Sequence, residues 1–90
     1  MDIKKEFEEI SETLKQQRDE LKLQMHLASM EAKEEWEKAE EKFEEIVDPL
    51  EDILDDTKET ASEVIEATKV IGDELMSAYK RIAEKLKKES

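Results

Sequence analysis

The sequence lacks cysteine altogether, and it contains a single glycine and a single proline among its 90 residues. Without cysteine, disulfide bonds and thiol catalysis are excluded. One glycine cannot build a glycine-rich phosphate-binding loop. No apolar run approaches the ~20 residues that cross a membrane, and the first residues hold no apolar stretch of signal-peptide type. We therefore expect no membrane span and a cytoplasmic location.

Basic residues are also scarce relative to acidic ones. The chain has 15 Lys and Arg residues against 27 Asp and Glu residues, which gives a net charge of −12. Such a charge disfavours nucleic acid and anionic membranes as partners. The excess is concentrated in residues 31–60, which hold fourteen acidic and four basic side chains. A cation or a basic protein remains open as a partner.

Charged residues make up 47% of the chain and hydrophobic residues 37%. This composition is typical of long helices or coiled coils. Apolar residues recur at spacings of three and four along most of the chain, which predicts helix rather than disorder. The sequence therefore predicts an all-α protein with a single domain over residues 1–90.

Asp48 and Pro49 form the strongest local signal in the chain. Asp48 suits a helix N-cap, Pro49 suits the first helical position, and Glu51 completes the spacing of a capping box. We therefore predict a long antiparallel two-helix hairpin, coiled-coil-like, with helix one over about 2–47, the corner at 48–49 and helix two over about 49–88. Two alternatives stay open: one continuous kinked helix, and a further break at residues 56–58 that would give three helices.

Around this corner the facing positions are apolar or small, as in the pairs of Ile10 with Leu86 and Leu14 with Ile82. Gln17 faces Tyr79, which we interpret as a polar pair that fixes the alignment of the helices. The predicted seam contains Leu14, Leu21, Met25, Trp36, Phe43, Ile53, Ile71, Leu75, Tyr79 and Ile82.

A second apolar stripe lies beside the seam, and a contiguous apolar patch usually marks an interface. We predict that it joins two hairpins in a homodimer with the form of an elongated four-helix bundle. The rival interpretation is that the stripe receives a helix from another protein. The predicted interface contains Leu23, Leu27, Met30, Ile65, Gly72, Met76 and Ala83. Gly72 is either a tolerated glycine or a point of close backbone approach.

Met25, His26 and Met30 are candidates for a metal or haem site, since His26 and Met30 lie four residues apart on one predicted helix. The competing interpretation places Met25 in the seam and Met30 in the interface. Acidic residues around the corner could attract a divalent cation, but we interpret them as a solvated face because no EF-hand spacing is present. These residues are Glu40, Glu41, Glu44, Glu45, Asp48, Glu51, Asp52, Asp55, Asp56 and Glu59.

Two segments, Arg18–Ala28 (RDELKLQMHLA) followed by Glu31–Glu37 (EAKEEWE), resemble small uncharacterised helical proteins of bacteria. The runs GDEL at residues 72–75 and AYKRI at residues 78–82 resemble the second half of the same group. The resemblance implies a bacterial helical protein in which His26, Trp36 and Tyr79 recur. It implies no activity.

The sequence shows no nucleophile placed with a base, no phosphate loop and no histidine pair, so we expect no enzyme and no cofactor. It predicts a structural or regulatory interaction protein, a scaffold or an adaptor, that acts through the surface of a helical bundle. Two alternatives stay open. One is an acidic decoy that mimics nucleic acid toward a basic partner. The other is an amphipathic coat for a lipid or polymer surface, which would require the hairpin to open.

Overall fold

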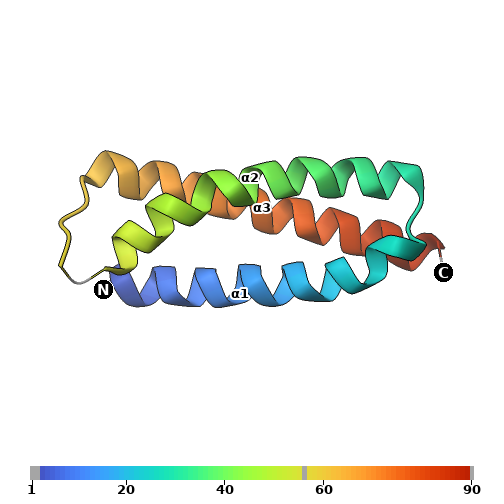
Figure 1. Ribbon diagram of the computed structural model, residues 1–90, viewed down its shortest axis with the longest axis horizontal. Coiled ribbons are helices and arrows are strands. Elements are labelled where there is room, and N and C mark those ends of the chain that lie inside the picture. Colours follow the sequence, from blue (N-terminus) through green and yellow to red (C-terminus); the bar gives the residue numbers. More distant parts are fainter. Residues whose placement is uncertain (1–2, 56, 90) are drawn as a thin grey trace.

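A computed structural model describes residues 3–55 and 57–89, and it contains three α-helices in an antiparallel bundle (Figure 1). Helix α1 spans Ile3–Gln24, a short 3₁₀ turn (η1) spans Met25–Leu27, α2 spans Met30–Leu54 and α3 spans Ser62–Glu89. Helices α1 and α3 run in the same direction and α2 runs in the opposite direction. The bundle measures 45 × 18 × 17 Å. The all-α prediction is confirmed, but the predicted two-helix hairpin is wrong.

The first turn of the chain lies at Ala28 and Ser29, in the middle of predicted helix one. The 3₁₀ turn ends at Leu27, and the Ala28 amide that follows donates to the Met25 carbonyl at 3.1 Å. Ala28 is extended, with ψ of 156°, and Ser29 then caps α2 by accepting from the Ala32 amide at 3.2 Å. A serine N-cap satisfies one of the amides that a helix start leaves without an intrahelical acceptor. This cap therefore divides the predicted helix into α1 and α2.

The predicted corner at Asp48 and Pro49 is wrong, because α2 runs through Pro49 without ending. A proline inside a helix removes one backbone hydrogen bond and costs about 3 kcal/mol. On both sides of it, α2 buries Ile46, Leu50 and Ile53, which are 0%, 7% and 9% exposed. Burying a large aliphatic side chain contributes about 1.5–3 kcal/mol. Three of them offset the proline, so the helix continues.

The second turn joins α2 to α3 and falls where the three-helix alternative placed a break. One carboxylate oxygen of Asp55 accepts from the Thr57 amide at 2.9 Å and from the Thr57 hydroxyl at 2.7 Å. This Asx turn offers the backbone an alternative to further helix. Helix α3 follows from Ser62, with the Ala61 carbonyl accepting from the amides of Val64 and Ile65. Asp56, which belonged to the predicted break, lies outside the described residues.

The core runs along the axis of the bundle and takes side chains from all three helices. Seven of the ten predicted seam residues are buried in it, and the other three, Trp36, Phe43 and Ile71, pack against it. Their predicted pairing is wrong because α1 and α3 are parallel. Ile10 lies within reach of Gly72 rather than opposite Leu86. The buried hydrophobic residues are Phe7, Leu14, Leu21, Met25, Ala32, Ala39, Ile46, Leu50, Ile53, Leu75, Ala78, Tyr79 and Ile82.

Ion pairs join every pair of helices at the edges of this core. Arg18 of α1 binds Glu40 of α2 at 2.7 Å, and Lys42 of α2 binds Glu74 of α3 at 2.6 Å. Lys69 of α3 lies 3.2 Å from Glu6 of α1. The pairs Lys42–Glu74 and Lys69–Glu6 are exposed, and exposed pairs contribute only about 0–1 kcal/mol each. The ion pairs therefore set how the helices align along the bundle and add little to its stability. Among the described residues, no helix is both long and apolar enough to cross a membrane.

Candidate functional site

A polar cluster interrupts the apolar core near the middle of the bundle. The Arg18 guanidinium donates to both carboxylate oxygens of Glu40, at 2.7 and 2.8 Å, and its central carbon lies 4.6 Å from the centroid of the Phe43 ring. A bidentate pair of this geometry is directional as well as attractive. The hydrogen bonds that Arg18 donates to Glu40 raise the pKa of Arg18. The cluster therefore fixes α1 against α2.

Tyr79 of α3 lies next to this cluster and is only 1% exposed. Its ring centroid is 6.0 Å from that of Trp36, with the two planes tilted by 30°. Burial, and to a smaller extent the charge of Glu40, raises the pKa of Tyr79 to about 12, although the charge of Arg18 opposes both effects. The phenol therefore stays neutral across the physiological range.

Three buried polar oxygens have no hydrogen-bond partner among the described residues. They are the Tyr79 hydroxyl, Oε1 of Gln17 and Oε2 of Glu35. The other carboxylate oxygen of Glu35 accepts from Lys85 at 2.9 Å, a bond that raises the pKa of Lys85. An unsatisfied buried polar group costs about 1–3 kcal/mol, so each one calls for an explanation.

Gln17 and Tyr79, predicted as a polar seam pair, line the same groove between α1 and α3. The groove has a volume of about 390 Å³ and an apolar lining with polar residues around it. We call it the α1–α3 groove. Its lining residues are Gln17, Glu20 and Leu21 from α1, and Met76, Ser77, Tyr79, Lys80 and Ala83 from α3. Among these, Glu20 and Lys80 are exposed and carry opposite charges.

The predicted interface does not form one surface. Gly72 is buried, and a Cβ placed there would meet side-chain carbons of Ile46 and Ile10, at 3.4 and 3.5 Å, rather than another backbone. Ile65, Met76 and Ala83 are half-buried and pack against the core. The hairpin register had placed all seven residues side by side, and that register is absent. The part that remains exposed is Leu23, Leu27 and Met30.

These three residues surround the turn between α1 and α2, and we call them the turn patch. Leu23 is 75% exposed, Leu27 82% and Met30 75%. Asp19, Lys22 and His26 line a surface hollow together with Leu23. The patch therefore combines apolar side chains with flanking charges of both signs.

The candidate metal or haem site at Met25, His26 and Met30 does not have its predicted geometry. The chain turns between His26 and Met30, so the two side chains are not neighbours on one helix. Met25 is buried in the core, whereas Met30 is exposed. Within the part of the chain that the structure describes, no group of three or more His, Asp or Glu side chains is arranged to hold a metal ion.

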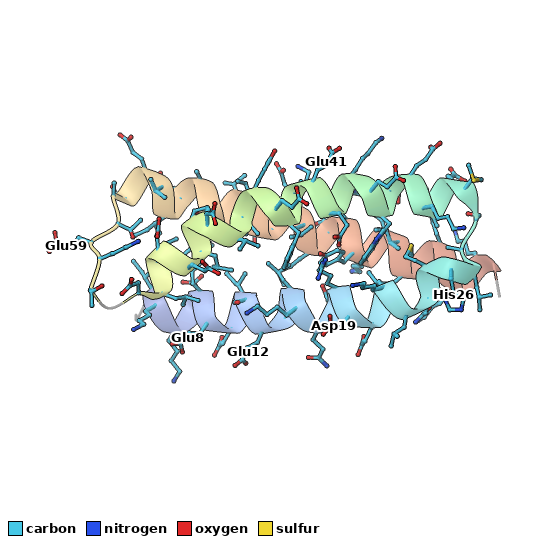
Figure 2. All side chains as sticks on the ribbon, in the orientation of Figure 1. Glu8, Glu12, Asp19, His26, Glu41 and Glu59 are labelled. Atoms are coloured by element: carbon cyan, nitrogen blue, oxygen red, sulfur yellow. The ribbon has the colours of Figure 1, made fainter. Side chains whose placement is uncertain are left out.

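The predicted acidic corner does not form, because α2 continues through Asp48 and Glu41 lies near the middle of the bundle (Figure 2). Residues 44–55 hold six acidic and no basic side chains, along the second half of α2 and its cap. Lys58 binds Asp52 at 2.9 Å, and the hydrogen bonds from Thr57 lower the pKa of Asp55. Figure 2 shows Glu59 at one end of the bundle and His26 at the other end, with Glu8, Glu12 and Asp19 directed away from the bundle. This charge is distributed over a solvated face.

Comparison of the chain with protein-family models, with curated proteins and with solved structures found no match. The resemblance to small bacterial helical proteins therefore stays a prediction.

Sequence reasoning missed the Arg18–Glu40 ion pair and the helix cap at Ser29, although Glu40 was among the acidic residues considered for a cation. Arg18 and Glu40 come together only because of the first turn. A signal for that turn was present in Ser29 itself, a favourable N-cap followed by the acidic first-turn residue Glu31. The even spacing of Ala28, Ala32 and Trp36, which departs from the alternation of threes and fours, marks the same point.

Proposed function

We propose that the protein is a non-enzymatic interaction module that self-associates through the turn patch. The observation that supports this proposal is the exposure of Leu23, Leu27 and Met30, at 75–82%, on a bundle whose other large apolar side chains mostly lie in or against one core. The three residues lie within eight positions of one another around one turn, and a contiguous exposed apolar patch marks an interaction site on a soluble protein.

The distribution of charge favours a second copy of the chain as the partner. Residues 44–55, which hold six acidic side chains, run from about the middle of the bundle to the end away from the turn patch (Figure 1). Two chains that meet at their turn patches can therefore keep their acidic ends apart. Near the patch, Asp19 and Lys22 carry opposite charges, and in a two-fold interface each can face the other residue of the partner chain. Self-association brings together two bundles of three helices, not two hairpins.

The expected effect of a single substitution can be estimated from the buried side chain. Burying a leucine contributes about 1.5–3 kcal/mol. Because an interface with two-fold symmetry contains Leu27 twice, Leu27→Lys removes about 3–6 kcal/mol of association free energy. This corresponds to a weakening of roughly two to four orders of magnitude in the dissociation constant.

The experiment is sedimentation equilibrium over a range of protein concentrations, on the natural chain, on Leu27→Lys and on Val70→Lys. Val70 is a matched control because it is an apolar side chain, 56% exposed, on α3 and outside the turn patch. We expect the natural chain and Val70→Lys to form dimers of equal affinity, and Leu27→Lys to remain a monomer. Circular dichroism of all three verifies that the helices are retained.

Three results would contradict the proposal. They are a natural chain that is monomeric at every concentration, a Leu27→Lys chain that dimerises as tightly as Val70→Lys, and a dimer that dissociates as salt rises. Screening reduces the repulsion between two chains of net charge −12, so added salt should preserve or strengthen the dimer. Steep weakening by salt is instead the behaviour of an acidic decoy bound to a basic partner.

A further inference from the structure

The turn between α1 and α2 is built from a segment that favours helix. Only Ala28 and Ser29 separate the 3₁₀ turn from α2, and the sequence contains no glycine or proline before Pro49. Four of the six residues from 25 to 30 are methionine, leucine or alanine, which are good helix formers. The composition of this segment therefore allows α1 and α2 to join in one continuous helix.

The buried positions of α1 and α2 also keep one helical phase across the turn. Positions seven residues apart lie on the same face of a helix. One series of buried residues follows this spacing, with a single step of fourteen, and it passes directly through the turn between its second and third members. The series is Ser11, Met25, Ala32, Ala39, Ile46 and Ile53. The bundle of Figure 1 does not require this match, because its turn reverses the chain, whereas a continuous helix from Ile3 to Leu54 requires it.

A continuous helix would separate α1 from the α2 and α3 of its own chain. It would be about 78 Å long at ~1.5 Å per residue, against 45 Å for the bundle. Two such chains, side by side and antiparallel, return each α1 to the α2 and α3 of the other chain. The contacts of α1 are then reproduced between chains, including the two hydrogen bonds from Arg18 to Glu40. Short hinge segments favour this kind of exchange.

We propose that the surface of α2 and α3 binds the α1 of a second copy of the chain, in an exchanged dimer in which α1 and α2 form one helix through Ala28 and Ser29. The exchange does not depend on the turn patch, since Leu23 and Met30 lie on the side of the continuous helix away from its buried positions. Because α1 must first leave the core, the exchanged dimer forms when chains fold together at high concentration.

The test mixes two chains, Arg18→Glu and Glu40→Arg, both of which also carry Leu27→Lys to remove association through the turn patch. Each chain alone brings two like charges together at a half-buried pair. An exchanged dimer of one chain with the other restores an Arg–Glu pair at both places, whereas dimers without exchange restore neither.

The two chains are unfolded in urea, refolded together at high concentration and counted by native mass spectrometry. We expect mixed dimers to outnumber like dimers by at least about tenfold, since two ion pairs are regained. Leu27→Lys chains that are otherwise natural, one of them labelled with ¹⁵N, are the control and should give equal numbers. Equal numbers for the charge-reversed chains, or no dimers, would overturn the proposal.

Ser29→Ala and Ser29→Pro provide a second test on the Leu27→Lys chain, and both lose the hydroxyl that caps α2. Ser29 has a φ of −67° and Ala28 before it is extended, so proline fits the present turn but breaks a continuous helix. Alanine fits both forms.

After refolding at high concentration, we expect Ser29→Pro to form at least about a hundredfold less dimer than Ser29→Ala. Circular dichroism verifies that both variants are helical. Equal dimer formation by the two variants would overturn the exchange. A chain that dimerises through the turn patch but fails both tests would leave the proposed function intact.

Discussion

Tyr79 lowers the stability of the bundle as pH rises into the alkaline range, and the size of this loss can be calculated. Its pKa is about 12 in the folded chain, against an ordinary value near 10. Between these two values the unfolded chain has lost the phenol proton while the folded chain retains it. The unfolded state therefore binds fewer protons, and the free energy of unfolding falls as pH rises.

The magnitude follows from the two pKa values. Integration gives a loss of about 1.4 kcal/mol by about pH 11, and a total of about 2.7 kcal/mol once both states are ionised. Lysine ion pairs also weaken over this range, so the natural chain alone cannot isolate the contribution of Tyr79. Tyr79→Phe keeps the ring and removes the ionisable group, so the lysine contribution cancels in the difference between the two proteins.

The assay is urea unfolding of the natural chain and of Tyr79→Phe, at about pH 8 and about pH 11. We expect the difference in unfolding free energy to change by about 1.4 kcal/mol between the two pH values, in favour of the phenylalanine variant. Because Tyr79 is the only tyrosine, the absorbance of its phenolate gives its pKa directly. A phenolate that titrates near pH 10 in the folded chain, or an unchanged difference between the two proteins, would refute the reasoning.

Three further substitutions test the fold through urea unfolding. Pro49→Ala should stabilise the bundle by about 1–3 kcal/mol because it restores a backbone hydrogen bond inside α2. A loss of stability would instead indicate that a helix ends near this residue, as in the predicted hairpin. Gly72→Ala should stabilise it by about 0.5–1 kcal/mol, since a methyl group there meets only side-chain carbons at 3.4 and 3.5 Å; a destabilisation would show that α3 packs more closely. Ser29→Ala should cost about 1 kcal/mol by removing the cap of α2, and no cost would argue against the turn at this point.

The apolar positions of the fold could be predicted from the sequence, but their partners could not. Spacing alone shows which side chains a helix must bury, and residues such as Leu14, Leu75 and Ile82 are indeed buried. It does not show which helix covers them. In a three-helix bundle each helix packs against two others, which buries more apolar surface than a two-helix hairpin of the same length. Small chains need that additional burial to be stable.

The turns were misplaced because capping signals are local, whereas the decision to continue a helix is not. Asp48 and Pro49 have the chemistry of a helix start, yet burial of Ile46, Leu50 and Ile53 maintains α2 through them. Ser29 has a weaker signal, without a Glu or Gln three residues later, and it nevertheless starts a helix. The α1–α3 groove could not be predicted, since it depends on the parallel arrangement of α1 and α3 that these turns produce.

The most direct test of self-association through the turn patch is a distance between two chains, measured by pulsed electron paramagnetic resonance. The chain has no cysteine, so His26→Cys and Glu59→Cys each provide a single site for a spin label at opposite ends of the 45 Å bundle (Figure 2). We predict a short distance between the two chains for the label at residue 26 and a distinctly longer one for the label at residue 59. A shorter distance at residue 59, or no coupling between chains at either position, would contradict the account.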